Sequence, residues 1–227
     1  MTPEELKEEL LELQDTAYRD FHLRTCPQAE HVIGVRMPEQ RRLAKQIVRS
    51  DFWYFLDQIK PTYYEETLIT GIVIATASMS LDDRFGYTAW FVPMINNWAI
   101  CDCFCASFKP KPEELAAWWD FLMSYRKSQQ EYELRFMLVM ILDHFMSEEY
   151  LARIFGLLDE IKSDLYYVEM AKAWLVAEFF AKFRDQTLEY LQSDQLSVFA
   201  HNKAIQKICE SRRVLLEDKQ TLRGMKL

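Results

Sequence analysis

The stretch INNWAICDCFCASF, from Ile95 to Phe108, holds the residues of this chain that are best suited to chemistry. Asp102 lies four positions after Trp98, and residues with that spacing share one face of an α-helix. A helix here therefore places a carboxylate beside an indole ring, and Asn96 or Asn97 is suited to cap its start. The alternative is that Trp98 belongs to the core and that Asp102 is a solvated acid. These two residues alone do not distinguish a functional site from this alternative.

Three of the chain's five cysteines lie in the same stretch, and they raise the alternative of a metal site. Successive residues of a helix are rotated by about 100°, so Cys101 and Cys105 share a face while Cys103 points roughly the opposite way. Three such thiolates do not close on one ion, and Cys26 and Cys209 have no ligand-like spacing. We therefore expect no metal, no disulfide framework, and reduced thiols that pack as small apolar side chains.

The composition favours a helical fold. Among the 227 residues, 50% are hydrophobic, which is enough for a sizeable core, and only five are glycine and seven proline. Helix-forming residues dominate, so we expect an all-α protein with a single domain over residues 1–227. No apolar run approaches the roughly 20 residues that cross a bilayer, and the start MTPEELKEELLEL is charged and amphipathic. These features predict a soluble, cytoplasmic protein with no membrane partner.

Apolar residues recur at spacings of three and four along most of the chain, as they do in amphipathic helices. A first helix is predicted from Thr2, its N-cap, to about Phe21, and the segment from Cys26 to Pro38 is predicted to be irregular. Further helices are predicted at 38–50, 51–59, 62–80, 82–92, 97–108, 112–126, 130–145, 147–161, 164–183, 185–192 and 195–210. Such helices, separated by short turns, suggest the stacked hairpins of a curved α-solenoid with HEAT-like repeats. A compact, non-repetitive helical bundle is the alternative.

Four blocks of the sequence carry a resemblance to a known family: HVIGVRMPEQRRLAK (31–45), NNWAICD (96–102), YELRFMLVMILDHF (132–145) and YYVEMAKAWLVAEFFAKF (166–183). In this order they resemble the DNA alkylation repair family, the AlkD-like proteins built from HEAT-like repeats. The resemblance implies a curved α-solenoid whose concave face holds duplex DNA. It also implies a DNA glycosylase, a hydrolase of the N-glycosidic bond that excises cationic N3- or N7-alkylated purines.

The resemblance has one gap, which lies near the N-terminus. In the family's active glycosylases an additional N-terminal helix helps to complete the cleft for the lesion. The stretch from Thr25 to Val35 is too short and too broken to form that helix. The chain therefore resembles a branch of the family with a shortened N-terminal region.

The same resemblance implies roles for four residues. Asp102 matches the catalytic carboxylate, and Trp98 and Trp174 match the two aromatic residues that face the lesion. Arg135 matches a basic residue near the DNA backbone. A purine alkylated at N3 or N7 is already cationic and leaves as a neutral base, so stabilisation of the oxocarbenium-like sugar is the remaining task. No metal or organic cofactor is implied. Taken alone, Trp174 also fits a core position, and Arg135 also fits an ion pair with Glu131 on its own helix.

Arg36, Arg42 and Lys45 belong to a basic run that contains two further arginines and a single glutamate. The run fits a patch that contacts DNA phosphates, and it fits a solvated helix face equally well. The formal net charge of the chain is −8, so a DNA-binding surface must be separated from the acidic faces. We therefore expect weak binding to alkylated duplex DNA.

Two functions remain open on the sequence. The first is a DNA repair glycosylase that acts through Asp102, Trp98 and Trp174. The second is a non-catalytic HEAT-like scaffold that binds another nucleic acid structure or a protein partner. A monomer is expected in either case.

Overall fold

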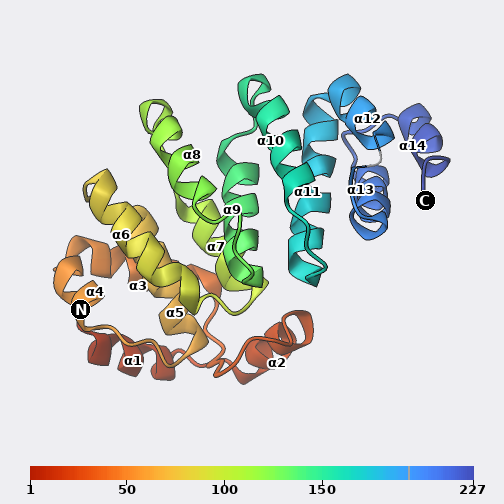
Figure 1. Ribbon diagram of the computed structural model, residues 1–227. Helices are drawn as coiled ribbons and strands as arrows, with labels where there is room; N and C mark the ends of the chain where they lie inside the picture. The colour runs from red at the N-terminus through yellow and green to blue at the C-terminus, as the bar shows by residue number, and fades with distance from the viewer. Residues whose placement is uncertain (194) are drawn as a thin grey trace. The chain divides into compact units, whose positions relative to one another are not determined.

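The computed structural model describes residues 1–193 and 195–227, and 72% of the protein is helical. No strand occurs among these described residues, so the predicted all-α fold is confirmed (Figure 1). None of the described helices is long and apolar enough to span a bilayer. The chain divides into two compact units, residues 1–109 and 110–227, and each is described by itself. The single domain over residues 1–227 stays a prediction.

In the first unit, the hairpins stack in chain order. Helices α3, α5 and α7 pack consecutively on one another, while α4 packs on α3 and α6 packs on α5. This is the packing of an α-solenoid, in which each hairpin contacts its neighbours. The elements are α1 (Pro3–Glu12), α2 (Thr16–Thr25), α3 (Met37–Arg49), α4 (Phe52–Gln58), α5 (Tyr64–Thr76), α6 (Leu81–Phe91), the 3₁₀ turn η1 (Val92–Met94) and α7 (Trp98–Ser107).

In the second unit, the same consecutive packing involves α9, α11 and α13. Helix α11 lies between α9 and α13 and also contacts α12, and α14 packs on α13. The elements are the 3₁₀ turn η2 (Pro112–Glu114), α8 (Leu115–Met123), α9 (Glu131–His144), α10 (Glu148–Glu160), α11 (Tyr166–Lys182), α12 (Arg184–Gln192), α13 (Val198–Glu210) and α14 (Leu216–Arg223).

Helix α5 forms the centre of the first unit, and it is buried over most of its length. A glycine, Gly71, allows its neighbours to come close. A Cβ atom at Gly71 would lie 2.9 Å from the ring of Phe91 in α6 and 3.1 Å from the ring of Phe104 in α7. The two rings contact each other with centroids 4.6 Å apart. The missing side chain of Gly71 therefore helps to set the position of α7 against α5.

The structure has two helices where the sequence predicts one from Thr2 to about Phe21. The predicted cap is confirmed, because the Thr2 hydroxyl accepts the backbone N–H of Glu5 at 3.2 Å. The prediction of a continuous helix is wrong, because α1 ends at Glu12 and a second helix starts after Asp15. The Asp15 carboxylate accepts the N–H of Tyr18 at 2.9 Å, and such a side-chain cap favours a new helix start over a continuous helix.

The other predicted helices are present, with ends that differ by a few residues. Helix α14 was not predicted, because its sequence LEDKQTLR is polar and lacks a repeating apolar pattern. Tertiary contacts hold it in place. Leu222 is fully buried, and Arg184 donates to the Asp218 carboxylate from two nitrogens at 2.9 and 2.5 Å.

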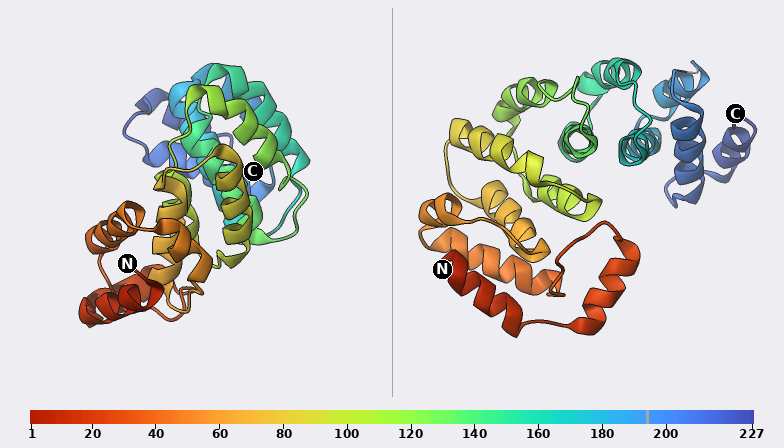
Figure 2. Two further views of the ribbon diagram at one scale, coloured as in Figure 1. Left: turned by 90° about the vertical axis from the view of Figure 1, so that its left-hand side faces the viewer. Right: turned by 60° about the horizontal axis from the view of Figure 1, so that its bottom comes forward.

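Residues 26–36 contain no helix, as predicted, and they carry the chain from α2 back to α3, a path visible on the right of Figure 2. One buried acid organises this loop. The Glu65 carboxylate is 1% exposed and accepts the backbone N–H groups of Ile33, Gly34 and Val35 at 3.0, 2.7 and 3.1 Å. Hydrogen bonds to a charged acceptor are stronger than neutral ones, and here they satisfy a carboxylate that would otherwise be costly to bury.

Gly34 lies where this loop meets the start of α2. Its φ angle is 100°, and its carbonyl oxygen accepts the N–H of Asp15 at 3.1 Å. A Cβ atom at Gly34 would lie 2.4 Å from the backbone oxygen of Asp15 and 2.7 Å from the Cβ of Arg19. The contact between the loop and α2 therefore requires glycine both for its conformation and for its lack of a side chain.

We predict that alanine at Gly34 and alanine at Gly86 change stability in opposite directions. Gly34→Ala should lower the free energy of unfolding by about 3 kcal/mol, because of its backbone conformation and its steric clash. Gly86 lies in α6 and a Cβ there meets no atom within 4 Å, so Gly86→Ala should raise the same quantity by about 0.5–1 kcal/mol. Urea denaturation followed by circular dichroism measures both changes, and equal effects would contradict this account of the loop.

Candidate active site

Trp98 and Asp102 lie one turn apart on α7, as predicted from their spacing. Asn97 is the N-cap of this helix, and its side-chain oxygen accepts the N–H of Ile100 at 3.0 Å. Asn97 is fully buried, whereas Trp98 and Asp102 are both partly exposed. The indole and the carboxylate are therefore displayed from a helix whose start is fixed in the core.

The cysteines of α7 divide as the helical geometry predicts. Cys101 and Cys105 are fully buried, and Cys103 is partly exposed. Burial raises the pKa of the Cys103 thiol, while the positive charge of Arg41 lowers it by a smaller amount. All five cysteines of the chain are free. Within the described residues, no group of three or more His, Cys, Asp and Glu side chains is arranged to hold a metal ion.

Cys26, in the loop after α2, lies against the first turn of α7. It is fully buried, and burial raises the pKa of its thiol. The backbone N–H groups of Ala99 and Ala29 face the sulfur and lower this pKa by smaller amounts, and the charge of Asp102 raises it. Cys26 is therefore a packing residue that brings the loop held by Glu65 next to the candidate carboxylate.

A tyrosine and a histidine form the contact between α2 and α5. The rings of His22 and Tyr64 are 4.7 Å apart, and the Nε2 atom of His22 is buried without a hydrogen-bond partner. Burial lowers the pKa of His22, and the charge of Glu65 raises it by a smaller amount. Burial also raises the pKa of Tyr64 far above its ordinary value. Both rings therefore favour their neutral forms in the folded protein.

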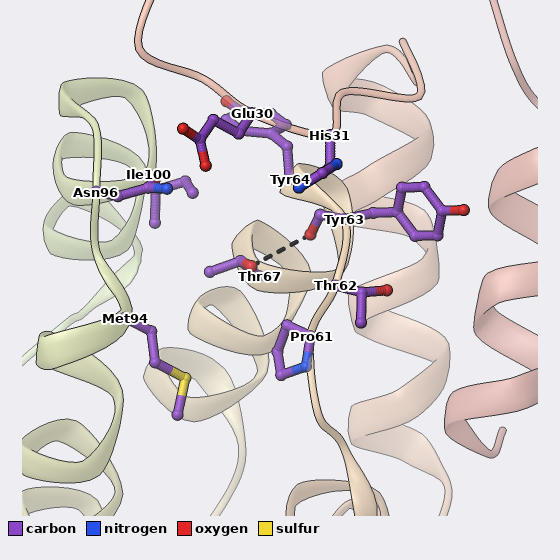
Figure 3. A pocket seen from close by; sticks show the side chains of 10 residues that line it. All are labelled: Glu30, His31, Pro61, Thr62, Tyr63, Tyr64, Thr67, Met94, Asn96 and Ile100. Carbon is purple, nitrogen blue, oxygen red and sulfur yellow. Dashed lines mark hydrogen bonds between the residues drawn. The ribbon is translucent and has the colours of Figure 1, made fainter.

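A pocket of about 180 Å³ opens beside the start of α7 (Figure 3). Glu30 and His31 form one side of it, and the Glu30 carboxylate points across toward Asn96 and Ile100. His31 adopts a φ angle of 51°, which is uncommon for a residue other than glycine. No sequence pattern predicts this pocket, because its lining depends on the path of the loop. The lining residues are Glu30, His31, Pro61, Thr62, Tyr63, Tyr64, Thr67, Met94, Asn96 and Ile100.

Arg135 and Trp174 lie in the second unit, on α9 and α11. Arg135 is 5% exposed, and its Nη1 atom donates to the backbone oxygen of Tyr167 at 2.9 Å. The N–H of the same tyrosine donates to Glu131 at 2.7 Å. Arg135 and Glu131 therefore hold the start of α11 against α9. Trp174 is partly exposed, and the DNA-facing roles of Arg135 and Trp174 stay predictions.

The predicted basic patch is in part neutralised by acids. Arg36 donates to the Asp15 carboxylate from Nε at 3.0 Å and from Nη2 at 2.8 Å. Arg42 pairs with Glu39 at 2.7 Å and with Glu9 at 3.3 Å. Lys45 is exposed, and no ion pair involves it within the described part of the chain.

The chain matches a known protein family. A family model described as DNA alkylation repair enzyme matches residues 6–208. No curated protein gives a significant match to the chain.

We predict that His22 makes the stability of the protein depend on pH. Folding lowers the pKa of His22 below the ordinary value of 6.5, so the unfolded chain binds a proton here at a higher pH than the folded chain does. As the pH falls below 6.5, wild-type protein should lose stability relative to His22→Gln, by at most about 1.4 kcal/mol per pH unit. Above this pH the difference should be constant. Unfolding free energies of both proteins across the range measure it, and a difference independent of pH would contradict the assignment.

Proposed function

Because the chain belongs to the DNA alkylation repair family, we propose that it repairs duplex DNA by hydrolysing the N-glycosidic bond of purines alkylated at N3 or N7. The main support for this function is the position of Trp98 and Asp102 on α7. Asp102 follows Trp98 by one helical turn, and both side chains are partly exposed. An acid displayed in this way can approach a deoxyribose, which a carboxylate sealed in the core cannot.

The chemistry needs no general acid and no cofactor. When the C1′–N bond breaks, its electron pair goes to the purine, which leaves as a neutral base because it was cationic beforehand. Positive charge then develops on the deoxyribose, and the Asp102 carboxylate stabilises it electrostatically. Water adds to C1′ and loses a proton, either to solvent or through Asp102. The product is an abasic site.

Aromatic and basic residues supply the remaining parts of the proposed site. The indole of Trp98 can attract the cationic base through its ring face, an interaction of about 0.5–2 kcal/mol. Trp174, in the second unit, stays a predicted aromatic contact. Arg135 is 5% exposed and donates to the backbone oxygen of Tyr167, so it would reach a phosphate only by leaving that contact. In the first unit, Arg36, Arg42 and Lys45 would contact phosphates. For Arg36 and Arg42 this requires exchange of a carboxylate for a phosphate, because both are paired with acids.

This acid pairing favours a second candidate function. A phosphate contact that first has to displace Asp15 or Glu39 gains less than one made by a free arginine. With a formal net charge of −8, the chain would then bind duplex DNA too weakly for repair. It would act instead as a non-catalytic scaffold for another nucleic acid structure or for a protein.

We predict that the wild-type protein releases N7-methylguanine from methylated duplex DNA and that Asp102→Asn slows this release by at least roughly 100-fold. The amide keeps the size of the side chain and removes the charge that stabilises the sugar. Single-turnover release of the base, followed by chromatography at low salt, gives the rate constants.

Asp120→Asn is the matched control, because Asp120 is an exposed aspartate on α8. Its rate should equal that of the wild type. Release that stays at background for the wild type, or equal rates for Asp102→Asn and the wild type, would exclude the glycosylase. Retardation of duplex DNA without release would favour the scaffold.

A further inference from the structure

A groove separates α4 from α6 on the surface of the first unit, and we call it the α4–α6 groove. It has a volume of about 390 Å³, and Leu56 of α4 and Gly86 of α6 are among the residues that line it. Tyr87 and Trp90 line it from α6. These features involve no residue of the proposed active site on α7.

Trp53 of α4 adjoins the lining of this groove through its contact with Tyr87. The ring centroids of Trp53 in α4 and Tyr87 in α6 are 5.9 Å apart, and those of Tyr87 and Trp90 are 6.4 Å apart. Trp53 is 41% exposed and Trp90 is 39% exposed. Both tryptophans are thus partly open to solvent on either side of Tyr87, and clusters of exposed aromatic residues are typical of surfaces that bind other proteins.

The charges that line the groove are all negative. Asp57 lies on the α4 side, and Asp82 and Asp83 lie at the start of α6. Burial raises the pKa of Tyr87, and the charges of Asp57 and Asp83 raise it further, so acids from both helices face the same ring. The nearby cation, Arg84, donates to the backbone oxygens of Ile74, Ala75 and Ala77 at the end of α5. Its charge is thus directed at the end of α5.

The groove has room for an occupant. A Cβ atom at Gly86 would meet no other atom within 4 Å. A bound chain can therefore approach the backbone of α6 at this point, between the tyrosine and the acids. Glycine in the middle of a helix is unfavourable, and close approach of another molecule is one reason to find it there.

We propose that the α4–α6 groove binds a basic segment of a partner protein, with arginine or lysine side chains placed over Trp53 and Trp90 and paired with Asp57 and Asp82. Arginine stacks on indole rings and pairs with carboxylates at the same time. Three carboxylates and no lining cation repel a polyanion, so this surface is not a further DNA contact. The chemistry selects a cationic, partly apolar peptide.

The test uses the full chain labelled with nitrogen-15 and an octapeptide of alternating arginine and leucine. The indole N–H signals of Trp53 and Trp90, assigned with the Trp53→Phe and Trp90→Phe variants, report on the groove. We expect saturable shifts of both signals with a Kd of about 1 mM or tighter. The same peptide with glutamate in place of arginine should shift neither signal.

Two variants test the groove directly. Gly86→Leu adds a side chain at a position where a Cβ atom meets no other atom within 4 Å. Asp57→Asn combined with Asp82→Asn removes charge without changing the size of the side chains. Each should weaken binding by about tenfold or more. Gly156→Leu is the matched control, because Gly156 in α10 also has no atom within 4 Å of a Cβ and lies in the other unit. It should leave the affinity unchanged.

Four results would overturn the proposal. They are no saturable shift up to about 1 mM peptide, equal binding of the glutamate peptide, equal affinity in Gly86→Leu and Gly156→Leu, and self-association of the wild-type chain that Gly86→Leu abolishes. The last result, measured by sedimentation, would mean that the groove binds a second copy of this chain.

Discussion

The first unit depends on the hydrogen bonds that the carboxylate of Glu65 accepts. It is buried in α5 and accepts three consecutive backbone N–H groups, those of residues 33–35. The loop fixed in this way contacts α2 through Gly34 and brings Cys26 to the first turn of α7, beside Asp102. The irregular loop cannot satisfy these N–H groups with its own backbone, and the carboxylate accepts their hydrogen bonds instead. These bonds in turn offset the cost of burying the charge at the centre of the unit.

In the second unit, acids in the first turns of α9 and α11 accept hydrogen bonds from the start of the next long helix. Glu131 at the start of α9 accepts the N–H of Tyr167 at 2.7 Å, and Arg135, one turn later, donates to the oxygen of the same residue at 2.9 Å. Glu169 in the first turn of α11 pairs with Lys172 at 3.0 Å and accepts the hydroxyl of Ser197, the N-cap of α13. Ionic groups thus join successive hairpins, and Arg135, Glu169 and Lys172 among them are buried. Removing one partner of a buried ion pair is expected to lower stability by more than the pair itself contributes.

The helical class, the buried faces of α7 and the positions of Trp98 and Asp102 one turn apart follow from periodicity, because a helix repeats locally and its faces can be read from spacing. The break at Asp15 was missed, since an aspartate is compatible both with a helix surface and with a cap. The polar helix α14 was missed because its position depends on tertiary contacts. The pocket beside α7 joins residues that are distant in sequence, and so do the ion pairs of Arg36 with Asp15 and of Arg42 with Glu9. No local pattern encodes them. The DNA-facing roles of Arg135 and Trp174 rest on the family resemblance and stay predictions.

Hydrogen exchange of Glu65→Gln measures whether the charge of Glu65 holds residues 33–35, because the amide keeps the shape of the side chain and loses its charge. We predict faster exchange of the N–H groups of Ile33, Gly34 and Val35, and of the first turn of α7 at Ala99, relative to the wild type. Exchange within α9, for example at Leu138, should not change, because α9 belongs to the other unit. Unchanged protection of residues 33–35 in Glu65→Gln would contradict the claim that this carboxylate holds the loop.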